Sequence, residues 1–192
     1  MAETKNILLC GVGGQGIITA SKILAAGLIS VGYDVKMSEV HGMAQRGGSV
    51  TTQVRFGEKV WSPIIGLGQA DILVSFETME TGKWLEYLKP AGKVVVNDYR
   101  IPSAPILSGA ADYPEGILEA LSGKADTTAI KAEGIAVGLG NIKTMNVVLL
   151  GALVKAMGLT EINWEEVVKT TVKPKFIDVN IQAMKAGMEM IK

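Results

Sequence analysis

The sequence feature that most constrains the fold is the glycine-rich run at residues 11–16, GVGGQG, which satisfies the pattern G-x-G-x-x-G. An apolar stretch at 7–10 precedes it, and apolar residues recur at helical spacing across 17–31 after it. Glycine accepts positive φ angles and lets the backbone approach a ligand closely, and the first turn of a helix offers unpaired N–H groups to an anion. The run therefore predicts a strand–turn–helix unit that contacts an anion or a cofactor, although the same glycines could serve only to form a tight turn. No Lys-Ser or Lys-Thr pair follows, so the run is not a nucleotide-binding P-loop.

Strand and helix patterns alternate along most of the chain. We expect strands at 7–10, 34–38, 50–56, 70–76, 93–97 and 127–131, and helices at 17–31, 77–88 and 143–157. The segment 59–61 is expected to form a hairpin with the strand before it, the Pro-Ala-Gly sequence at 90–92 to form a turn, and residues 100–116 to form a loop. This alternation predicts an α/β fold, namely a three-layer α/β/α Rossmann-like domain with a mostly parallel sheet.

The length of 192 residues fits one domain, 1–192. Within it we expect an α/β core at 1–158 and a helical extension at 159–192. Apolar residues near the end recur at steps of four and three, which predicts a C-terminal amphipathic helix; they are Ile177, Ile181, Met184, Met188 and Ile191. We expect this helix to pack on its own domain, although its methionines also suit a partner surface.

The composition excludes several classes of protein. The chain has 19 basic and 19 acidic residues, so no overall charge attracts it to nucleic acid or to an anionic membrane. The longest stretch without a charged side chain, 6–21, is too short and too polar to cross a bilayer. The single cysteine, Cys10, cannot form an internal disulfide and cannot supply the roughly four ligands of an iron–sulfur cluster or a structural zinc ion. Because we also find no export signal, we expect a cytoplasmic protein.

A second group of polar residues lies at 38–49, after the second predicted strand, and includes the only histidine of the chain. A loop at this position lies at the carboxyl edge of the sheet beside the first glycine turn, where open α/β sheets bind ligands. The planar guanidinium of Arg46 suits a phosphate or a carboxylate, although Arg46 could instead pair with Glu39 at the surface. His41 has a side chain suited to acid–base chemistry, but a single loop histidine more often only donates or accepts a hydrogen bond.

A third segment, 138–146, repeats the sequence of a glycine turn followed by a helix, and we expect it after another strand. Asn141 is the expected N-cap, and Asn146 is expected inside the helix with its amide bonded to nearby backbone. We expect Cys10 to be a core residue. The predicted catalytic residues are His41 and Arg46, and no metal ligands are predicted. The predicted cofactor-binding residues are Gly11, Gly13, Gly14, Gln15, Gly16, Glu39, Gln45, Arg46, Gly47, Gly48, Asn141 and Asn146.

Together, the three segments resemble the γ-type subunit of the 2-oxoacid:ferredoxin oxidoreductases, and within that family the small β subunit of the indolepyruvate type. The residues that carry the resemblance are the run at 11–16, the sequence SEVHGM running into QRGGS at 38–49, and the Gly140-Asn141 turn with Asn146. The resemblance covers nearly the whole chain. Ala44 stands where we expect a small hydroxyl residue in many relatives, so one hydrogen bond of the family is not expected here.

The resemblance implies thiamine-diphosphate-dependent oxidative decarboxylation of a 2-oxoacid, with an aryl pyruvate implied by the indolepyruvate type. It also implies that coenzyme A accepts the acyl group and that ferredoxin accepts the electrons. This chain has one cysteine and no Gly-Asp-Gly sequence typical of thiamine diphosphate sites. We therefore expect thiamine diphosphate with Mg²⁺ and the iron–sulfur clusters on a larger partner subunit. This chain would complete the active-site cleft, contact coenzyme A through backbone N–H groups and Arg46, and be inactive alone.

Two other functions remain open from the residues alone. The first is a self-contained NAD(P)-binding protein, because Glu39 lies about where a dinucleotide fold places the acidic residue that binds the ribose. The second is a non-enzymatic module that senses a ligand or assists assembly through the glycine turn and the C-terminal helix.

Overall fold

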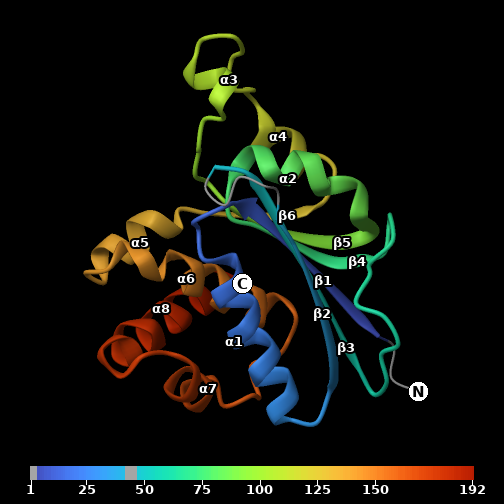
Figure 1. The fold of residues 1–192 in the computed structure, drawn as a ribbon, viewed down its shortest axis with the longest axis vertical. Coiled ribbons are helices and arrows are strands. Elements are labelled where there is room, and N and C mark those ends of the chain that lie inside the picture. The colour runs from blue at the N-terminus through green and yellow to red at the C-terminus, as the bar shows by residue number, and fades with distance from the viewer. Residues whose placement is uncertain (1–3, 42–46) are drawn as a thin grey trace.

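A six-stranded sheet forms the centre of the protein in the computed structural model, which describes residues 4–41 and 47–192 (Figure 1). Its strands are β1 (Lys5–Val12), β2 (Asp34–His41), β3 (Ser49–Gly57), β4 (Ala70–Ser75), β5 (Leu88–Asn97) and β6 (Asp126–Ile130). They lie in the order β2-β3-β1-β4-β5-β6. Strands β1, β4, β5 and β6 run parallel, whereas β3 is antiparallel to both of its neighbours, β1 and β2.

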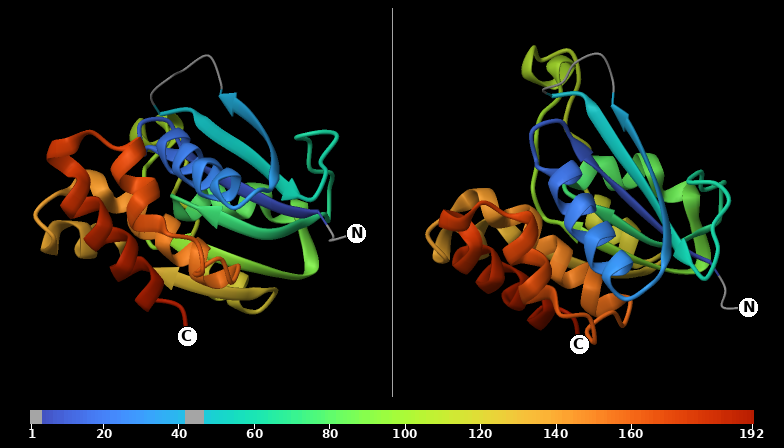
Figure 2. Two further views of the ribbon diagram at one scale, coloured as in Figure 1. Left: turned by 90° about the horizontal axis from the view of Figure 1, so that it is seen from below. Right: turned by 60° about the horizontal axis from the view of Figure 1, so that its bottom comes forward.

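Helices cover both faces of this sheet (Figures 1 and 2). They are α1 (Ile17–Ser30), α2 (Thr78–Trp84), α3 (Ala104–Leu107), α4 (Ile117–Ser122), α5 (Ala132–Gly138), α6 (Met145–Ala156), α7 (Trp164–Thr171) and α8 (Ile177–Glu189). Helices α1, α6, α7 and α8 lie on one face, and α2 and α4 lie on the other. The predicted three-layer α/β/α fold with a mostly parallel sheet is confirmed.

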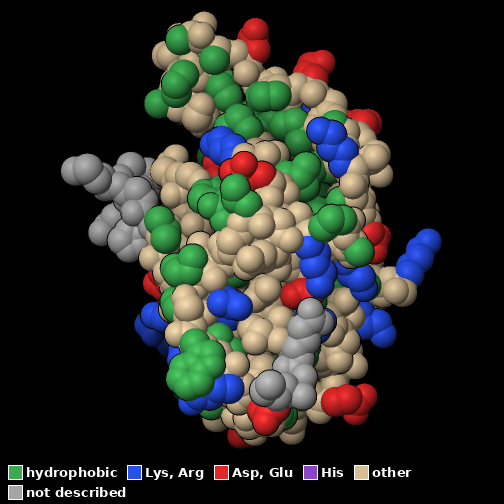
Figure 3. Space-filling view, turned by 90° about the vertical axis from the view of Figure 1, so that its right-hand side faces the viewer, with side chains coloured by type: hydrophobic (Ala, Val, Ile, Leu, Met, Phe, Trp, Pro, Cys, Tyr) green, Lys and Arg blue, Asp and Glu red, His purple; other side chains and the backbone are tan. Residues whose placement is uncertain are grey.

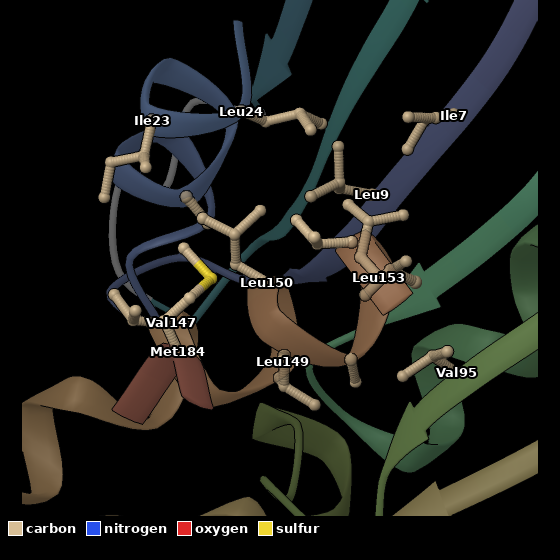
Figure 4. Close-up of a cluster of buried hydrophobic side chains, with 14 of the residues drawn as sticks. Ile7, Leu9, Ile23, Leu24, Val95, Val147, Leu149, Leu150, Leu153 and Met184 are labelled. Atoms are coloured by element: carbon tan, nitrogen blue, oxygen red, sulfur yellow. The ribbon is translucent and has the colours of Figure 1, made fainter. Parts of the chain in front are cut away.

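The two hydrophobic cores explain why β1 is an unbroken apolar run. Successive side chains of a strand point to opposite faces. Ile7 and Leu9 accordingly join the larger core under α1 and α6, whereas Leu8 and Cys10 join the smaller core under α2. All four side chains are fully buried, and Figure 4 shows Ile7 and Leu9 facing the α6 side chains. Cys10 is thus a core residue, as the sequence predicts.

The C-terminal helix α8 packs against α6 of its own domain. Met184 is buried in the larger core and is labelled there beside Val147 and Leu150 of α6 (Figure 4). The two helix backbones approach very closely, because a Cβ atom added at Gly187 would lie 1.9 Å from the Val148 carbonyl oxygen. A Cβ added at Gly151 would lie 2.1 Å from the Met184 carbonyl oxygen. The predicted amphipathic helix and its packing on its own domain are both confirmed.

Several local predictions are wrong. Residues 59–61 form no strand; the segment that contains them is irregular and is held by side chains of the sheet, with Val60 N–H donating to Asp34 Oδ2 (2.9 Å) and Ile65 N–H to Gln53 Oε1 (2.6 Å). The helix predicted at 77–88 ends at Trp84 and continues as a 3₁₀ turn, Leu85–Tyr87. The predicted turn at 90–92 lies inside β5, where the pairing with β4 is irregular.

The short helices α3, α4 and α5 were not expected from the sequence, and the bounds of α7 within the expected helical extension 159–192 were not predicted. Helices this short are marginal by themselves and depend on tertiary packing. In α7, the ring of Trp164 lies against Gly27 of α1, where an added Cβ would lie 2.4 Å from the ring, and the indole N–H donates to the Leu159 carbonyl (2.8 Å). The 3₁₀ turns Ile142–Thr144 and Pro174–Phe176 lead into α6 and α8.

The surface carries no single dominant character on the face shown in Figure 3, where hydrophobic, basic and acidic side chains are interspersed. This mixture agrees with the equal numbers of basic and acidic residues in the sequence. Within residues 4–41 and 47–192, no helix has both the length and the apolar character needed to span a membrane.

We predict that Gly187→Ala destabilises the protein by about 1–3 kcal/mol, because the new methyl group would force α6 and α8 apart. The matched control is Gly134→Ala in α5, where an added Cβ meets nothing within 4 Å. There alanine should be neutral or stabilise by about 0.5–1 kcal/mol, since it is the better helix former. Urea unfolding of both variants measures the difference, and equal stability of the two variants would contradict the close helix contact.

Candidate functional site

The first glycine turn connects β1 to α1 and is held in shape by one side chain. Gly14 and Gly16 have φ angles of +103° and +79°, conformations that L side chains rarely adopt. The Gln15 side chain accepts a hydrogen bond from Val12 N–H (2.8 Å) and donates one to the Phe76 carbonyl at the end of β4 (2.6 Å). The predicted strand–turn–helix unit is therefore formed, and the amide of Gln15 fixes the turn to the neighbouring strand.

The second predicted segment lies directly beside this turn. Gly13 N–H donates to the Gly48 carbonyl (2.8 Å), and Gly47 N–H donates to the Gly13 carbonyl at the longer distance of 3.5 Å. These contacts arise because β3 starts at Ser49 and pairs with the end of β1. The backbone thus brings together the glycines of two segments that are more than thirty residues apart in the sequence.

Three of the predicted site residues in this segment cannot be placed. Gln45 and Arg46 lie outside the described residues. His41 is the last residue of β2, but its side chain also lies outside what the structure describes. Their proposed roles therefore stay predictions.

The third predicted segment contacts the first turn through Asn146, a long-range contact that sequence reasoning missed. The Asn146 amide is buried and donates to the Gly16 carbonyl (3.1 Å), 130 positions away in the chain. The prediction that it bonds to nearby backbone is wrong, because α6 packs beside the start of α1. The sequence predicts that the segment follows a strand, and this is wrong, because it follows helix α5. Asn141 caps as predicted, accepting from Lys143 N–H (3.1 Å).

Two hollows meet at the first glycine turn. One has a volume of about 370 Å³ and is lined by residues 12–18 and Val50. The other has a volume of about 580 Å³ and is lined by residues 14–16 and 141–146, with Thr19, Val172, Phe176 and Asn180. Because residues 14–16 line both, we call the combined surface the glycine groove. Six of the predicted cofactor-binding residues line it: Gly13, Gly14, Gln15, Gly16, Asn141 and Asn146. Two more, Gly47 and Gly48, bond to the backbone of Gly13.

The groove has the features of an anion site. Helix α1 begins here, and among the described residues neither a side-chain cap nor an acidic residue in its first turn satisfies the free N–H groups. A Cβ added at Gly14 would meet nothing within 4 Å, so the bare glycine leaves room beside these N–H groups. Lys143 lines the second hollow, is exposed, and forms no ion pair with any described residue. Sequence reasoning did not select Lys143, because only the fold brings it to the first turn.

Two other predicted residues lie away from the groove. Gly11 is inside β1 and is required by packing, since an added Cβ would lie 2.7 Å from Gln15 Oε1 and 2.8 Å from Phe76 Cβ. Glu39 on β2 is aligned with Thr52 on β3, and Thr52 is aligned with Leu9 on β1. Strand β3 therefore separates Glu39 from the glycine turn, whereas dinucleotide sites place the acidic residue on the strand next to that turn. The arrangement that the NAD(P) alternative requires is not formed.

Buried acids lie behind the groove, and sequence reasoning missed them. Glu77 is fully buried and accepts from Glu80 N–H (2.9 Å), Ile101 N–H (3.1 Å) and the Tyr113 hydroxyl (2.5 Å). Burial, together with the hydrogen bond to this carboxylate, raises the pKa of Tyr113 above its ordinary value. Glu80 accepts from the Ser49 hydroxyl (2.5 Å) and pairs with Lys83 (2.5 Å). Both carboxylates have hydrogen-bond partners within the fold and lie at the start of α2.

The described residues do not suit a metal or a cluster. Nowhere in residues 4–41 and 47–192 do three His, Cys, Asp or Glu side chains gather as a metal site would require. Burial raises the pKa of the Cys10 thiol far above its usual value, so the thiolate form that ligates metals is disfavoured.

The comparisons with known proteins define the class. A family model described as pyruvate ferredoxin/flavodoxin oxidoreductase matches residues 6–190. The chain therefore belongs to the pyruvate ferredoxin/flavodoxin oxidoreductase family, and the predicted resemblance and the classification as an enzyme subunit are confirmed.

Individual relatives are similar over their whole length. The chain is 43% identical to the indolepyruvate oxidoreductase subunit IorB of Thermococcus kodakarensis, covering 97% of this chain and 96% of the relative. It is 40% identical, with the same coverage, to the IorB subunit of Pyrococcus horikoshii.

Solved structures share the fold. A pyruvate oxidoreductase subunit, PORC, from Thermotoga maritima has a TM-score of 0.74 at 22% identity, covering 97% of this chain and 96% of that one. A 2-oxoglutarate:ferredoxin oxidoreductase from Magnetococcus marinus also has a TM-score of 0.74, at 19% identity, and there the match covers 98% of this chain but only 31% of the longer chain.

We predict that Gly16→Ala costs about 1–2 kcal/mol more stability than Gly140→Ala. Both glycines have positive φ angles, +79° and +84°, so alanine is strained at either position. Only at Gly16 would the new Cβ lie 2.7 Å from Asn146 Nδ2 and displace its hydrogen bond, whereas a Cβ at Gly140 meets nothing within 4 Å. Adding Asn146→Ala should remove this excess cost in a double-mutant cycle measured by urea unfolding. Strictly additive effects would argue against the contact.

Proposed function

We propose that this chain completes the active-site cleft of a 2-oxoacid:ferredoxin oxidoreductase of the indolepyruvate type, which converts an aryl pyruvate to an acyl-CoA and passes electrons to ferredoxin. The substrate class is supported by the relatives named indolepyruvate oxidoreductase subunit, at 43% and 40% identity. The proposed role of the chain is supported mainly by the glycine groove, where three segments far apart in the sequence meet at the start of α1.

In this proposal the groove binds the phosphates of coenzyme A. The N–H groups at the start of α1 donate to a phosphate, and the missing side chain at Gly14 lets the phosphate come close. The Lys143 ammonium adds a positive charge from the second hollow. Apolar side chains that line the hollows, among them Ile17 and Phe176, exclude water and so strengthen these interactions.

Arg46 and His41 complete the proposed site from the connection between β2 and β3. Arg46 is proposed to bind a phosphate or the substrate carboxylate, since Gly47 and Gly48, which follow it, lie beside Gly13. His41 is the acid–base candidate of this chain.

The remaining cofactors are proposed to lie on a larger partner subunit. Thiamine diphosphate with Mg²⁺ supplies the electron sink for decarboxylation, and iron–sulfur clusters carry the electrons to ferredoxin. The single buried cysteine and the lack of a metal-ligand group among the described residues support this division. The structure from Magnetococcus marinus agrees with this division, because the shared fold covers only 31% of that longer chain.

We predict that Lys143→Ala raises the KM for coenzyme A by about three- to tenfold in the complex reconstituted with the larger subunit. The loss of one exposed charge-assisted phosphate contact is worth about 1 kcal/mol, and 1.4 kcal/mol corresponds to a factor of ten. Lys143→Arg should retain most of the affinity. Lys155→Ala, which removes an exposed charge from α6 outside both hollows, is the matched control and should leave the KM unchanged. Equal KM values for Lys143→Ala and the control would remove Lys143 from the site.

We predict a larger effect for Arg46→Ala in the same assay, about ten- to a hundredfold in the KM for coenzyme A or for the 2-oxoacid, with the fold retained. A bidentate contact of a guanidinium with a phosphate or carboxylate is worth about 1.5–3 kcal/mol. Circular dichroism confirms the fold of the variant, and unchanged kinetics would make Arg46 a surface residue.

A further inference from the structure

A ring of hydrogen bonds and contacts underlies the glycine groove. On one side, Asn146 Nδ2 donates to the Gly16 carbonyl (3.1 Å). On the other side, Gln15 Nε2 donates to the Phe76 carbonyl (2.6 Å), and the same carbonyl accepts from Asn97 Nδ2 (3.2 Å). Gln15 and Gly16 are adjacent in the first turn, so the two sides start from neighbouring residues.

Asn97 closes this ring. Its amide nitrogen also lies 3.4 Å from the Met145 sulfur, and Met145 is adjacent to Asn146 in α6. Its side-chain Oδ1 accepts from Ala132 N–H at the start of α5 (3.2 Å). Asn97 lines neither hollow of the groove. It contacts the Phe76 carbonyl, to which Gln15 of the first turn also bonds, and Met145 of α6, the helix that contains Asn146.

The environment of Asn97 makes these contacts costly to lose. The residue ends β5 and is fully buried, so water cannot replace a lost partner. The side-chain amide nitrogen of Asn97 has two partners, and its side-chain oxygen has one, all within the protein. A buried polar group left without a partner costs free energy, so the whole set tends to form or open together.

We infer that Asn97 is a positioning residue for the glycine groove: it sets how the Gly13–Gly16 turn faces the Asn141–Asn146 turn, and thereby the affinity of the groove for its phosphate-bearing ligand. It touches no ligand itself. The part of the inference that concerns affinity rests on the proposed function, whereas the part that concerns the geometry of the two turns does not.

The test compares Asn97→Ala with Gln53→Ala in the full chain. Gln53 is also a buried amide, 8% exposed, and its side chain accepts from Ile65 N–H (2.6 Å); it lies on β3, which is separated from β5 by β1 and β4. Both variants lose a buried amide, so both should be destabilised. Only Asn97→Ala should speed the hydrogen exchange of the Gln15 N–H, which donates to Val12 O (3.2 Å) within the turn, by about tenfold in NMR measurements. Gln53→Ala should leave that rate within about twofold.

A second variant covers the case in which Asn97→Ala does not fold. Met145→Leu removes the sulfur acceptor with little change of volume. It should speed the same exchange by about threefold, while the amides of α8 keep their rates.

The outcomes separate this inference from the proposed function. If a folded Asn97→Ala exchanges Gln15 N–H as the unchanged protein does, or if Gln53→Ala speeds it equally, the positioning role is overturned. In the reconstituted complex, Asn97→Ala should raise the KM for coenzyme A at least threefold while kcat changes less than twofold. If exchange speeds up but neither Asn97→Ala nor Lys143→Ala changes that KM, the role of Asn97 in the geometry is upheld and the assignment of coenzyme A fails.

Discussion

The structure depends on how the backbone groups at the carboxyl ends of β1, β4 and β5 find partners where the regular strand pairing stops. Phe76 N–H extends the ladder to the Cys10 carbonyl (2.8 Å), but the Phe76 carbonyl has no further strand to meet. Two side-chain amides, from Gln15 and Asn97, satisfy it instead. The same amides attach the first glycine turn, the start of α5 and the first residue of α6 to the sheet. The shape of the groove is therefore a consequence of meeting the hydrogen-bonding needs of buried strand ends.

The fold class could be predicted because its signals are local. The apolar run of β1, the glycines that follow it and the periodicity of α1 and α8 all lie within short windows of sequence. The order of the strands could not be predicted, because nothing in 34–57 states that β3 turns back between β1 and β2. The bounds of helix α7 within the helical extension could not be predicted for a similar reason, since Trp164 packs on the flat surface at Gly27, far away in the chain.

The site was predicted in part. The glycines at 13–16 and at 47 and 48 were expected to meet, and the backbone brings them together. Asn146 was assigned a local partner because a sequence shows which residues are near in the chain and not which helices are neighbours. Lys143 lies inside the third predicted segment but looks like an ordinary surface lysine, and Asn97 is an asparagine at a strand end that belongs to none of the three segments. Their positions relative to the first turn appear only once α6, β5 and that turn are placed in space.

The antiparallel strand β3 has a consequence for how this scaffold can vary. Because β3 starts at Ser49 and pairs there with the end of β1, Gly47 and Gly48 bring the chain into the sheet directly beside Gly13. Substitution at the start of β3 can therefore reshape one side of the groove while α1, β1 and the amides behind them stay unchanged.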